Sequence, residues 1–250
     1  MTHLLPRVLG GPSAPLLAPY RLLGVHGRIL LVEDDMSVQE TTRLLLDRAG
    51  MDVVAVADGH QALKLFETQD FDVVVLDLML PSIDGLTVCR EIRRVSRVPI
   101  VVLTALADPA QIVEGLESGA DDYVTKPFHG PEFVARVRAA LRRSVVDDPG
   151  MVLRFGTLDI DGAACRVTDD GRPVDLSVTE FRLLLELARN PDRVLTREDL
   201  VERVWGYAYL GDSRLVDMAV KRLREKIGDD PRQPRYIATV RGVGYRFTAS

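Results

Sequence analysis

Residues 72–77 read Asp-Val-Val-Val-Leu-Asp, an apolar run that ends in a carboxylate. Three further runs are each followed by a polar side chain: 28–32 by Glu33 and Asp34, 99–103 by Thr104, and 122–125 by Lys126. Runs rich in Val, Ile and Leu are typical of strands with both faces covered by helices. In an open parallel sheet, ligands bind at the carboxyl ends of such strands. The pattern therefore predicts one functional site where these polar groups meet.

Strand-like and helix-like segments alternate five times between residues 28 and 143. The predicted strands are 28–33, 52–56, 72–77, 99–103 and 121–125; the predicted helices are 36–49, 59–68, 85–95, 109–118 and 131–143. Gly and Pro punctuate the boundaries. Repeated βα units predict a doubly wound α/β domain with a five-stranded parallel sheet and right-handed crossovers.

The remaining chain has a different texture. Residues 1–27 hold no acid and no clear periodicity, and we expect a flexible extension or a misassigned start. Residues 144–150 indicate a short polar linker. From 151 to 250 we expect a smaller α+β domain: short strands, helices at 178–189, 196–203 and 213–227, then a hairpin, as in a winged helix-turn-helix. Ser177 to Glu180 predicts a capping box for its first helix.

Composition excludes several classes of protein. The chain is 46% hydrophobic and 28% charged, ordinary values for a soluble protein. No apolar run approaches the ~18 residues of a membrane span, so we expect a cytoplasmic protein without membrane contact. Cys89 and Cys165 lie far apart and indicate reduced thiols. The four histidines form no ligand-spaced cluster, which argues against zinc.

Charge is uneven within the net value of −5. Residues 27–144 carry 19 acids and 13 bases, a net of −6, whereas 151–250 carry 16 acids and 17 bases, a net of +1. The asymmetry fits a sensor joined to a polyanion binder, although chance explains it equally well.

The predicted sheet edge has the chemistry of a metal-assisted phosphoryl acceptor. Converging carboxylates repel each other, and a hard cation removes that penalty. Mg²⁺ prefers oxygen ligands and retained waters, so we expect Asp34 and Asp77 as direct ligands, Glu33 through water, and the Met79 carbonyl as a further oxygen. Asp77 is the predicted nucleophile.

Lys126 and the Thr104 hydroxyl would neutralise and position phosphoryl oxygens. A solvated lysine and a helix N-cap are the ordinary roles of such residues taken alone. The chain has only four lysines, however, and this one follows a strand within Thr-Lys-Pro-Phe.

These stretches resemble the receiver domain of two-component response regulators, a flavodoxin-like fold. The resemblance rests on Ile-Leu-Leu-Val-Glu-Asp-Asp, Val-Val-Val-Leu-Asp-Leu-Met-Leu-Pro, Ile-Val-Val-Leu-Thr-Ala and Gly-Ala-Asp-Asp-Tyr-Val-Thr-Lys-Pro-Phe, and covers about 28–143. It implies that Asp77 takes phosphate from the phosphohistidine of a sensor kinase. It also implies Thr104 and Tyr123 as a switch pair and a cis Lys126–Pro127 bond.

The helix predicted at 213–227 places apolar residues on one side and cations on the other side and its flanks. An ordinary solvated helix has the same pattern, but Thr239 to Arg246 looks like a wing hairpin with its own arginines. Such a helix enters the major groove, and such a wing contacts phosphate or the minor groove. The candidate DNA-binding residues are Arg214, Lys221, Arg222, Arg224, Thr239, Arg241 and Tyr245.

Residues 151–249 resemble the winged-helix output domain of the OmpR/PhoB subfamily. The resemblance rests on Leu-Thr-Arg-Glu-Asp-Leu, Val-Trp-Gly, Leu-Val-Asp-Met-Ala-Val-Lys-Arg-Leu-Arg-Glu-Lys-Ile-Gly and the wing. It implies double-stranded DNA with tandem half-sites as a partner, and RNA polymerase contact through loop 205–212. Trp205 itself is expected to pack in the core or loop.

The same resemblance implies that phosphorylation pairs two receivers into a homodimer through the fourth helix, fifth strand and fifth helix. The candidate interface residues are Glu117, Asp121, Asp122, Arg136, Arg138 and Arg142. Exposed ion pairs are each worth about 0–1 kcal/mol, so these would set register more than affinity.

The leading hypothesis is a phosphorylation-switched transcription factor that is not primarily a catalyst. A regulator that ignores phosphate would leave the Asp77, Thr104 and Lys126 set unexplained. A phosphohydrolase would want an acid two residues after its nucleophile, where this chain has Met79. The sequence contains neither a Walker loop nor a Rossmann glycine fingerprint, so we do not expect a nucleotide-dependent enzyme.

Overall fold

The structure is a computed structural model that describes residues 27–104, 109–143, 152–208 and 213–248. The predicted extension up to residue 26, the linker 144–150 and the end of loop 205–212 lie outside the described residues. Within the described ranges, no helix is both long and apolar enough to cross a membrane.

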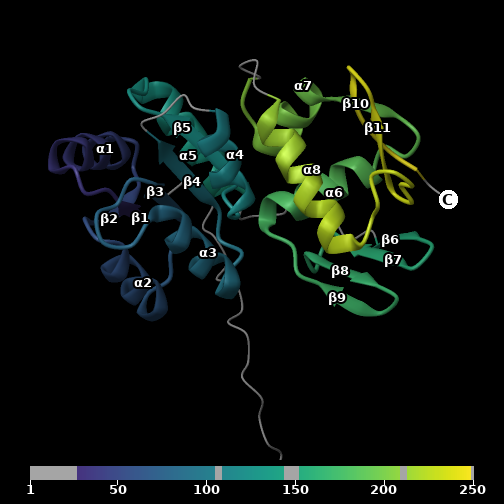
Figure 1. Cartoon of the computed structure of the whole chain (residues 1–250), viewed down its shortest axis with the longest axis horizontal. Coiled ribbons are helices and arrows are strands. Elements are labelled where there is room, and N and C mark those ends of the chain that lie inside the picture. The colour runs from purple at the N-terminus through teal and green to yellow at the C-terminus, as the bar shows by residue number, and fades with distance from the viewer. Residues whose placement is uncertain (1–26, 105–108, 144–151, 209–212, 249–250) are drawn as a thin grey trace, which may run out of the picture.

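The N-terminal domain is built on one parallel five-stranded sheet with the order β2-β1-β3-β4-β5 (Figure 1). Its strands are β1 (Arg28–Val32), β2 (Asp52–Val56), β3 (Val73–Asp77), β4 (Ile100–Thr104) and β5 (Asp122–Thr125). All four pairings are parallel. The predicted doubly wound α/β fold is therefore confirmed.

Five helices cover the two faces of this sheet. They are α1 (Met36–Arg48), α2 (Gly59–Thr68), α3 (Gly85–Val95), α4 (Pro109–Glu117) and α5 (Gly130–Arg143). Alternate strand residues point to opposite faces. Ile29, Leu31 and Val75 pack with residues of α1 and α5, while Leu30, Val74 and Leu76 pack with residues of α2, α3 and α4. Both faces of the sheet are buried under helices, which explains why the strands are apolar at successive positions.

The sheet order places a crevice at the ends of β1 and β3. From β1 the chain first goes outward to β2 and then returns to β3 on the other side, so the crossovers diverge there. This is the switch point at which α/β sheets bind ligands. Gly85 keeps α3 close to the crevice, because a Cβ there would collide with the backbone of Asp77 and Leu78.

Side-chain caps set where several helices begin. Asp35 accepts the N–H groups of Ser37 and Val38 at the start of α1. Asp58 and Asp84 cap α2 and α3 in the same manner. Each of these acids follows a strand or loop, so the chain turns into a helix as soon as the cap satisfies the first free N–H groups.

The C-terminal domain combines two antiparallel sheets with a set of helices. The first sheet runs β6 (Val152–Phe155), β7 (Leu158–Asp161), β8 (Arg166–Asp169) and β9 (Arg172–Val174). The second has the order β10-β12-β11, with β10 (Val194–Thr196), β11 (Ile237–Val240) and β12 (Gly244–Phe247). Hairpin β11–β12 is the predicted wing, and the expected α+β winged-helix architecture is confirmed.

The helices of this domain are α6 (Val178–Ala188), α7 (Arg197–Leu200), the π-helix η1 (Val201–Trp205) and α8 (Arg214–Ile227). Ser177 and Glu180 form the predicted capping box of α6. Two features differ from the sequence expectation. The helix predicted at 196–203 is a short α-turn followed by η1, and β10 was not predicted because its three residues pair with the distant β12.

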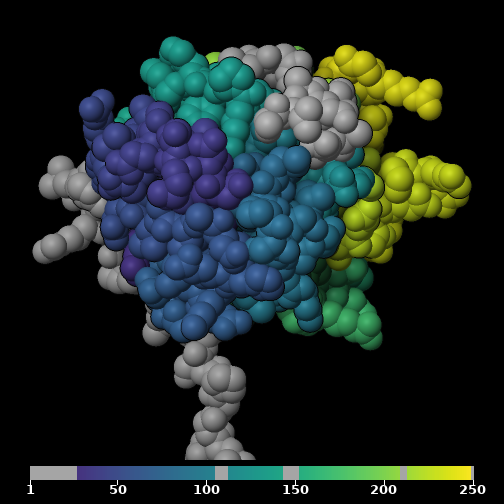
Figure 2. Space-filling view, turned by 60° about the vertical axis from the view of Figure 1, so that its left-hand side comes forward, coloured from purple at the N-terminus to yellow at the C-terminus, as the bar shows by residue number. Residues whose placement is uncertain are grey.

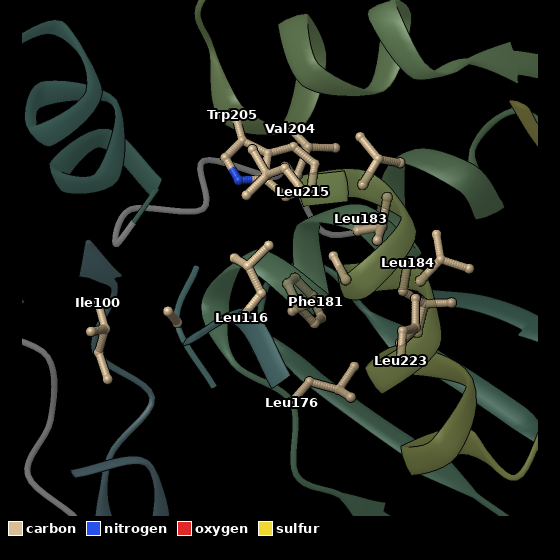
Figure 3. Packing of buried hydrophobic residues seen from close by; sticks show 14 of the residues in the cluster. Ile100, Leu116, Leu176, Phe181, Leu183, Leu184, Val204, Trp205, Leu215 and Leu223 are labelled. Atoms are coloured by element: carbon tan, nitrogen blue, oxygen red, sulfur yellow. The ribbon is translucent and has the colours of Figure 1, made fainter. Parts of the chain in front are cut away.

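The two domains pack against each other and share one hydrophobic cluster. Figure 3 shows Leu116 of α4 beside Phe181 of α6, with Trp205 and Leu215 nearby. In Figure 1, α8 lies next to α4, and in the turned view of Figure 2 the N-terminal domain lies in front of the C-terminal domain.

Candidate functional site

Three carboxylates converge at the switch point. Oxygen atoms of Glu33, Asp34 and Asp77 all lie within 4.8 Å of one another. Glu33 and Asp77 are buried: Glu33 directly follows β1, and Asp77 is the last residue of the buried strand β3. The sequence prediction that these acids meet at one sheet edge is therefore confirmed. The third acid of the run, Asp35, caps α1, and its hydrogen bonds from Val38 and Ser37 lower its pKa.

Lys126 supplies the positive charge of the cluster. Its Nζ donates to Glu33 Oε2 at 2.5 Å and to Asp77 Oδ2 at 2.8 Å. Burial raises the pKa of Glu33 and repulsion from Asp77 adds to the rise, while Lys126 offsets part of it. Burial opposes the charge of Lys126, but hydrogen bonds to Asp77 and Glu33 outweigh it and raise the pKa of the ammonium. One ammonium does not neutralise three carboxylates, so a further cation would be favourable at this cluster.

The remaining residues predicted for the acceptor site and its switch lie on β4, on β5 and just after β3. Thr104 is fully buried at the end of β4, and its carbonyl accepts the N–H of Lys126 at 2.7 Å. Tyr123 is half-buried on β5. The Met79 N–H donates to Asp77 Oδ1 at 3.1 Å, and its side chain is exposed. The Lys126–Pro127 bond is cis, as the resemblance implied.

Helix α8 carries most of the candidate DNA-binding residues, but it does not present all of them to solvent. Lys221 is exposed and Arg214 is half-buried. Arg222 and Arg224 are 9% and 8% exposed, so their burial differs from the expectation that both face outward. The reason is tertiary: each guanidinium finds backbone carbonyls outside α8.

Two of the candidate DNA-binding residues, Arg224 and Tyr245, attach the wing to α8. Arg224 Nη2 donates to Ile237 O at 2.5 Å and to Thr239 Oγ1 at 2.9 Å. The Tyr245 hydroxyl donates to Asp217 Oδ1 at 2.7 Å, and burial together with this bond raises the pKa of Tyr245 to about 12. Thr239 and Arg241 are exposed on the wing. Arg224 and Tyr245 thus hold α8 and the wing together in this structure.

Most of the residues expected at a dimer interface lie instead at the contact between the two domains of one chain. Asp122 is buried and pairs with Arg136 at 3.0 Å, and the Tyr207 hydroxyl donates to both oxygens of Asp122. Glu117 pairs with Lys221 of α8 at 2.5 Å. Arg142 donates to the carbonyl of Gly206, whereas Arg138 donates within its own domain to Ala49. Cross-subunit pairing by these residues stays a prediction.

Asp121 differs most from its expected exposed position. It is 1% exposed and accepts from Arg93 at 2.7 Å and from the Ile100 N–H at 2.9 Å. Its Oδ1 accepts the Ser177 hydroxyl, and its carbonyl accepts the Trp205 indole N–H at 2.8 Å. The predicted packing role of Trp205 is confirmed. The sequence analysis did not predict that Arg93, Ser177 and Tyr207 hold Asp121 and Asp122 at the contact between the domains. Of the three, only Ser177 had a local sequence signal, the capping box of α6.

Two family descriptions match the chain. Residues 29–138 match "Response regulator receiver domain", and residues 171–247 match "Transcriptional regulatory protein, C terminal". Together they cover the acid cluster, α8 and the wing.

Individual proteins resemble most of the chain. It is 50% identical over 219 residues to the transcriptional regulatory protein AfsQ1 of Streptomyces coelicolor, covering 88% of this chain and 97% of that protein. It is also 50% identical over 219 residues to the DNA-binding response regulator MtrA of Mycolicibacterium smegmatis, with 88% and 96% covered. Among solved structures, a mutant of RitR matches with a TM-score of 0.71 and 30% identity over 89% of this chain and 99% of that one. With a receiver domain and a winged-helix regulatory domain in one chain, this protein belongs to the OmpR/PhoB-type response regulators.

Proposed function

We propose that this response regulator takes a phosphoryl group on Asp77 from a partner histidine kinase, and that phosphorylation promotes receiver dimerisation and promoter binding. The observation that carries the proposal is the cluster of Asp77, Glu33 and Asp34 beside the Lys126 ammonium. Phosphoryl transfer needs positioning and charge neutralisation more than covalent help, and this cluster has groups of both signs.

Mg²⁺ is the cation proposed for the cluster. The fit rests on the donor set, since all three side chains offer carboxylate oxygens at one edge, which a hard cation prefers. Asp34 and Asp77 would hold the ion directly, Glu33 through water, and the Met79 carbonyl would add an oxygen. When bound, the ion would neutralise the charge that develops on the transferred phosphoryl group.

The transfer itself is balanced by this chain and its donor. A carboxylate oxygen of Asp77 forms a bond to phosphorus, the bond from phosphorus to the donor nitrogen breaks, and the imidazole leaves with the electron pair. Lys126 stabilises one phosphoryl oxygen and Thr104 another. The chain acts as a phosphoryl acceptor with slow hydrolysis of its own acyl phosphate, rather than as a catalyst for a separate substrate.

The output side of the proposal is transcriptional. α8 and the wing would contact double-stranded DNA at tandem half-sites, and loop 205–212 would contact RNA polymerase. The exposed cations Lys221 and Arg241 support the DNA contact by their charge, and the exposed Thr239 supports it by its position on the wing. The family membership supports DNA as a partner.

Intact mass after incubation with Mg²⁺ and a small phosphodonor tests the acceptor. Wild type should gain one phosphoryl group, and Asp77→Ala should gain none. Asp35→Ala is the matched control, because it removes a neighbouring carboxylate that caps α1. An adduct that persists in Asp77→Ala would refute the assignment. A wild type that binds neither phosphate nor beryllofluoride would favour a regulator that works without phosphate.

A further inference from the structure

The packed arrangement of the two domains commits a recognition-helix side chain to the receiver. Arg222 projects from α8 and is buried against the end of α4. Its Nη1 donates to the carbonyl oxygens of Leu116 and Ala120, the latter at 2.9 Å. Its Nε donates to Glu180 of its own domain at 3.1 Å.

These two carbonyls belong to the last turn of α4 and the residues that follow it. The final carbonyls of a helix lack partners within the helix and carry the negative end of its dipole. A cation at that position is therefore favourable. The Leu116 carbonyl also accepts the Gly119 N–H at 3.1 Å, so Arg222 is an additional, charged donor that comes from the other domain. Separating α4 from α8 would remove this donor from the carbonyls of both Leu116 and Ala120.

Neighbouring contacts make this connection continuous. Glu180 also accepts Lys226 Nζ at 2.6 Å and the N–H of Ser177 at 2.8 Å. The Ser177 hydroxyl donates to Asp121, the residue just after Ala120. A closed path thus runs from the end of α4 through Arg222, Glu180 and Ser177 back to the receiver. All of these side chains are in the capping box of α6, on α8 or between α4 and β5.

We propose that Arg222 is a latch: it caps α4 in the docked form and must leave those carbonyl groups before α8 can contact DNA. The two uses exclude each other, because one guanidinium cannot be buried on α4 and also face a phosphate or a base. α4 follows Thr104 in the chain, so a rearrangement at the phosphorylated site that moves the last turn of α4 would release Arg222. The contact of α8 with DNA and this last step rest on the proposed function, whereas the docked contact of Arg222 does not.

The latch has a defined cost of opening. Hydrogen bonds with a charged partner are stronger than neutral ones, and losing this pair should shift the docked-to-open equilibrium by about 10-fold to 100-fold. The contacts of Glu180 within the C-terminal domain should survive the replacement of Arg222, because Glu180 still accepts from Lys226 and from the Ser177 N–H. By linkage, a change that opens the chain should tighten the binding of any ligand that favours the open form by up to the same factor.

The chain contains its own reporter of docking. Trp205 is the single tryptophan, is 1% exposed and bonds to Asp121 across the domain contact. Tryptophan emission of full-length Arg222→Met should be shifted to the red without any phosphate analogue, toward the emission of wild type with beryllofluoride. Affinity for beryllofluoride should rise by about 10-fold to 100-fold, as the linkage requires.

Lys221→Met is the matched control. It removes the adjacent cation of the same helix, which also has a receiver partner, but that pair is about half-exposed and should contribute little. Its emission and beryllofluoride affinity should stay near those of wild type. Both readouts are taken without DNA, so a lost DNA contact cannot imitate an opened latch.

Tyr207→Phe keeps the proposal testable if circular dichroism shows that Arg222→Met is unfolded. It removes the hydroxyl that bonds Asp122 and Arg136 and lies outside α8. A partial red shift is expected, because one interdomain contact is lost and Arg222 stays. Folded Arg222→Met that behaves as wild type or as Lys221→Met would overturn the latch, as would an unfolded Arg222→Met with an unshifted Tyr207→Phe. If wild type fails to bind beryllofluoride, the proposed function fails, while the emission comparison still decides the latch.

Discussion

Replacing Lys126 by methionine removes the ammonium that both Glu33 and Asp77 contact. The Lys126 side chain is 16% exposed, and the two carboxylates are 1% and 5% exposed. Breaking a buried ion pair by removing one partner costs about 3–5 kcal/mol. Because the lysine keeps some solvent contact and Glu33 can take up a proton, we expect the lower end, about 3 kcal/mol.

The assay is thermal unfolding followed by circular dichroism, with and without Mg²⁺. Without the ion, Lys126→Met should unfold roughly 10 °C below wild type. Mg²⁺ at about 100 times its Kd should return about 2.7 kcal/mol to the variant, and its Kd should be lower than that of wild type because the carboxylates have lost their competing cation. The variant should also accept phosphate much more slowly, since one phosphoryl oxygen loses its partner.

Lys64→Met is the control, since it removes the same charge from an exposed position on α2. Its free energy of unfolding should stay within about 0.5 kcal/mol of wild type. Equal midpoints for Lys126→Met and Lys64→Met without Mg²⁺ would refute the argument that Lys126 neutralises the cluster. A variant that is destabilised but does not respond to Mg²⁺ would refute the cation site and leave the ion pair.

Three further outcomes follow from buried groups elsewhere. Burial raises the pKa of Cys89 to about 11, so its thiol should react with a disulfide reagent at least about 100-fold more slowly than the thiol of the partly exposed Cys165. Mass analysis can compare the two rates, and equal rates would contradict the packing of α3. The pKa of Tyr245 is about 12, above its usual value of about 10, so its contribution to stability is present below pH 10 and is lost as the pH rises to 12. Asp217→Asn should move the spectrophotometric titration of Tyr245 toward 10, and an unmoved titration would exclude the hydrogen bond as a cause. Gly85→Ala should lower the melting midpoint and slow phosphorylation, because the added methyl meets the Asp77 backbone; an unchanged midpoint would show that α3 can shift freely.

Local sequence patterns were enough to predict the N-terminal sheet, its site and the wing. Apolar runs of strand length mark β1, β3 and β4, and parallel strands place their carboxyl ends at one edge, so Glu33 and Asp77 had to meet. The capping box at Ser177 is equally local, because its hydrogen bonds join residues three positions apart. Patterns of this kind can be read without knowing how distant segments pack.

The surfaces that the two domains use to contact each other could not be predicted, because they depend on contacts between distant segments of the chain. Arg222 and Leu116 are 106 positions apart, and nothing local distinguishes Arg222 from the exposed Lys221 beside it. Asp121 likewise reads as a surface acid until Arg93 and Ser177 are seen to surround it. A helical wheel assigns a side chain to a face, but whether that face meets water, DNA or another domain depends on contacts that form only when the whole chain has folded.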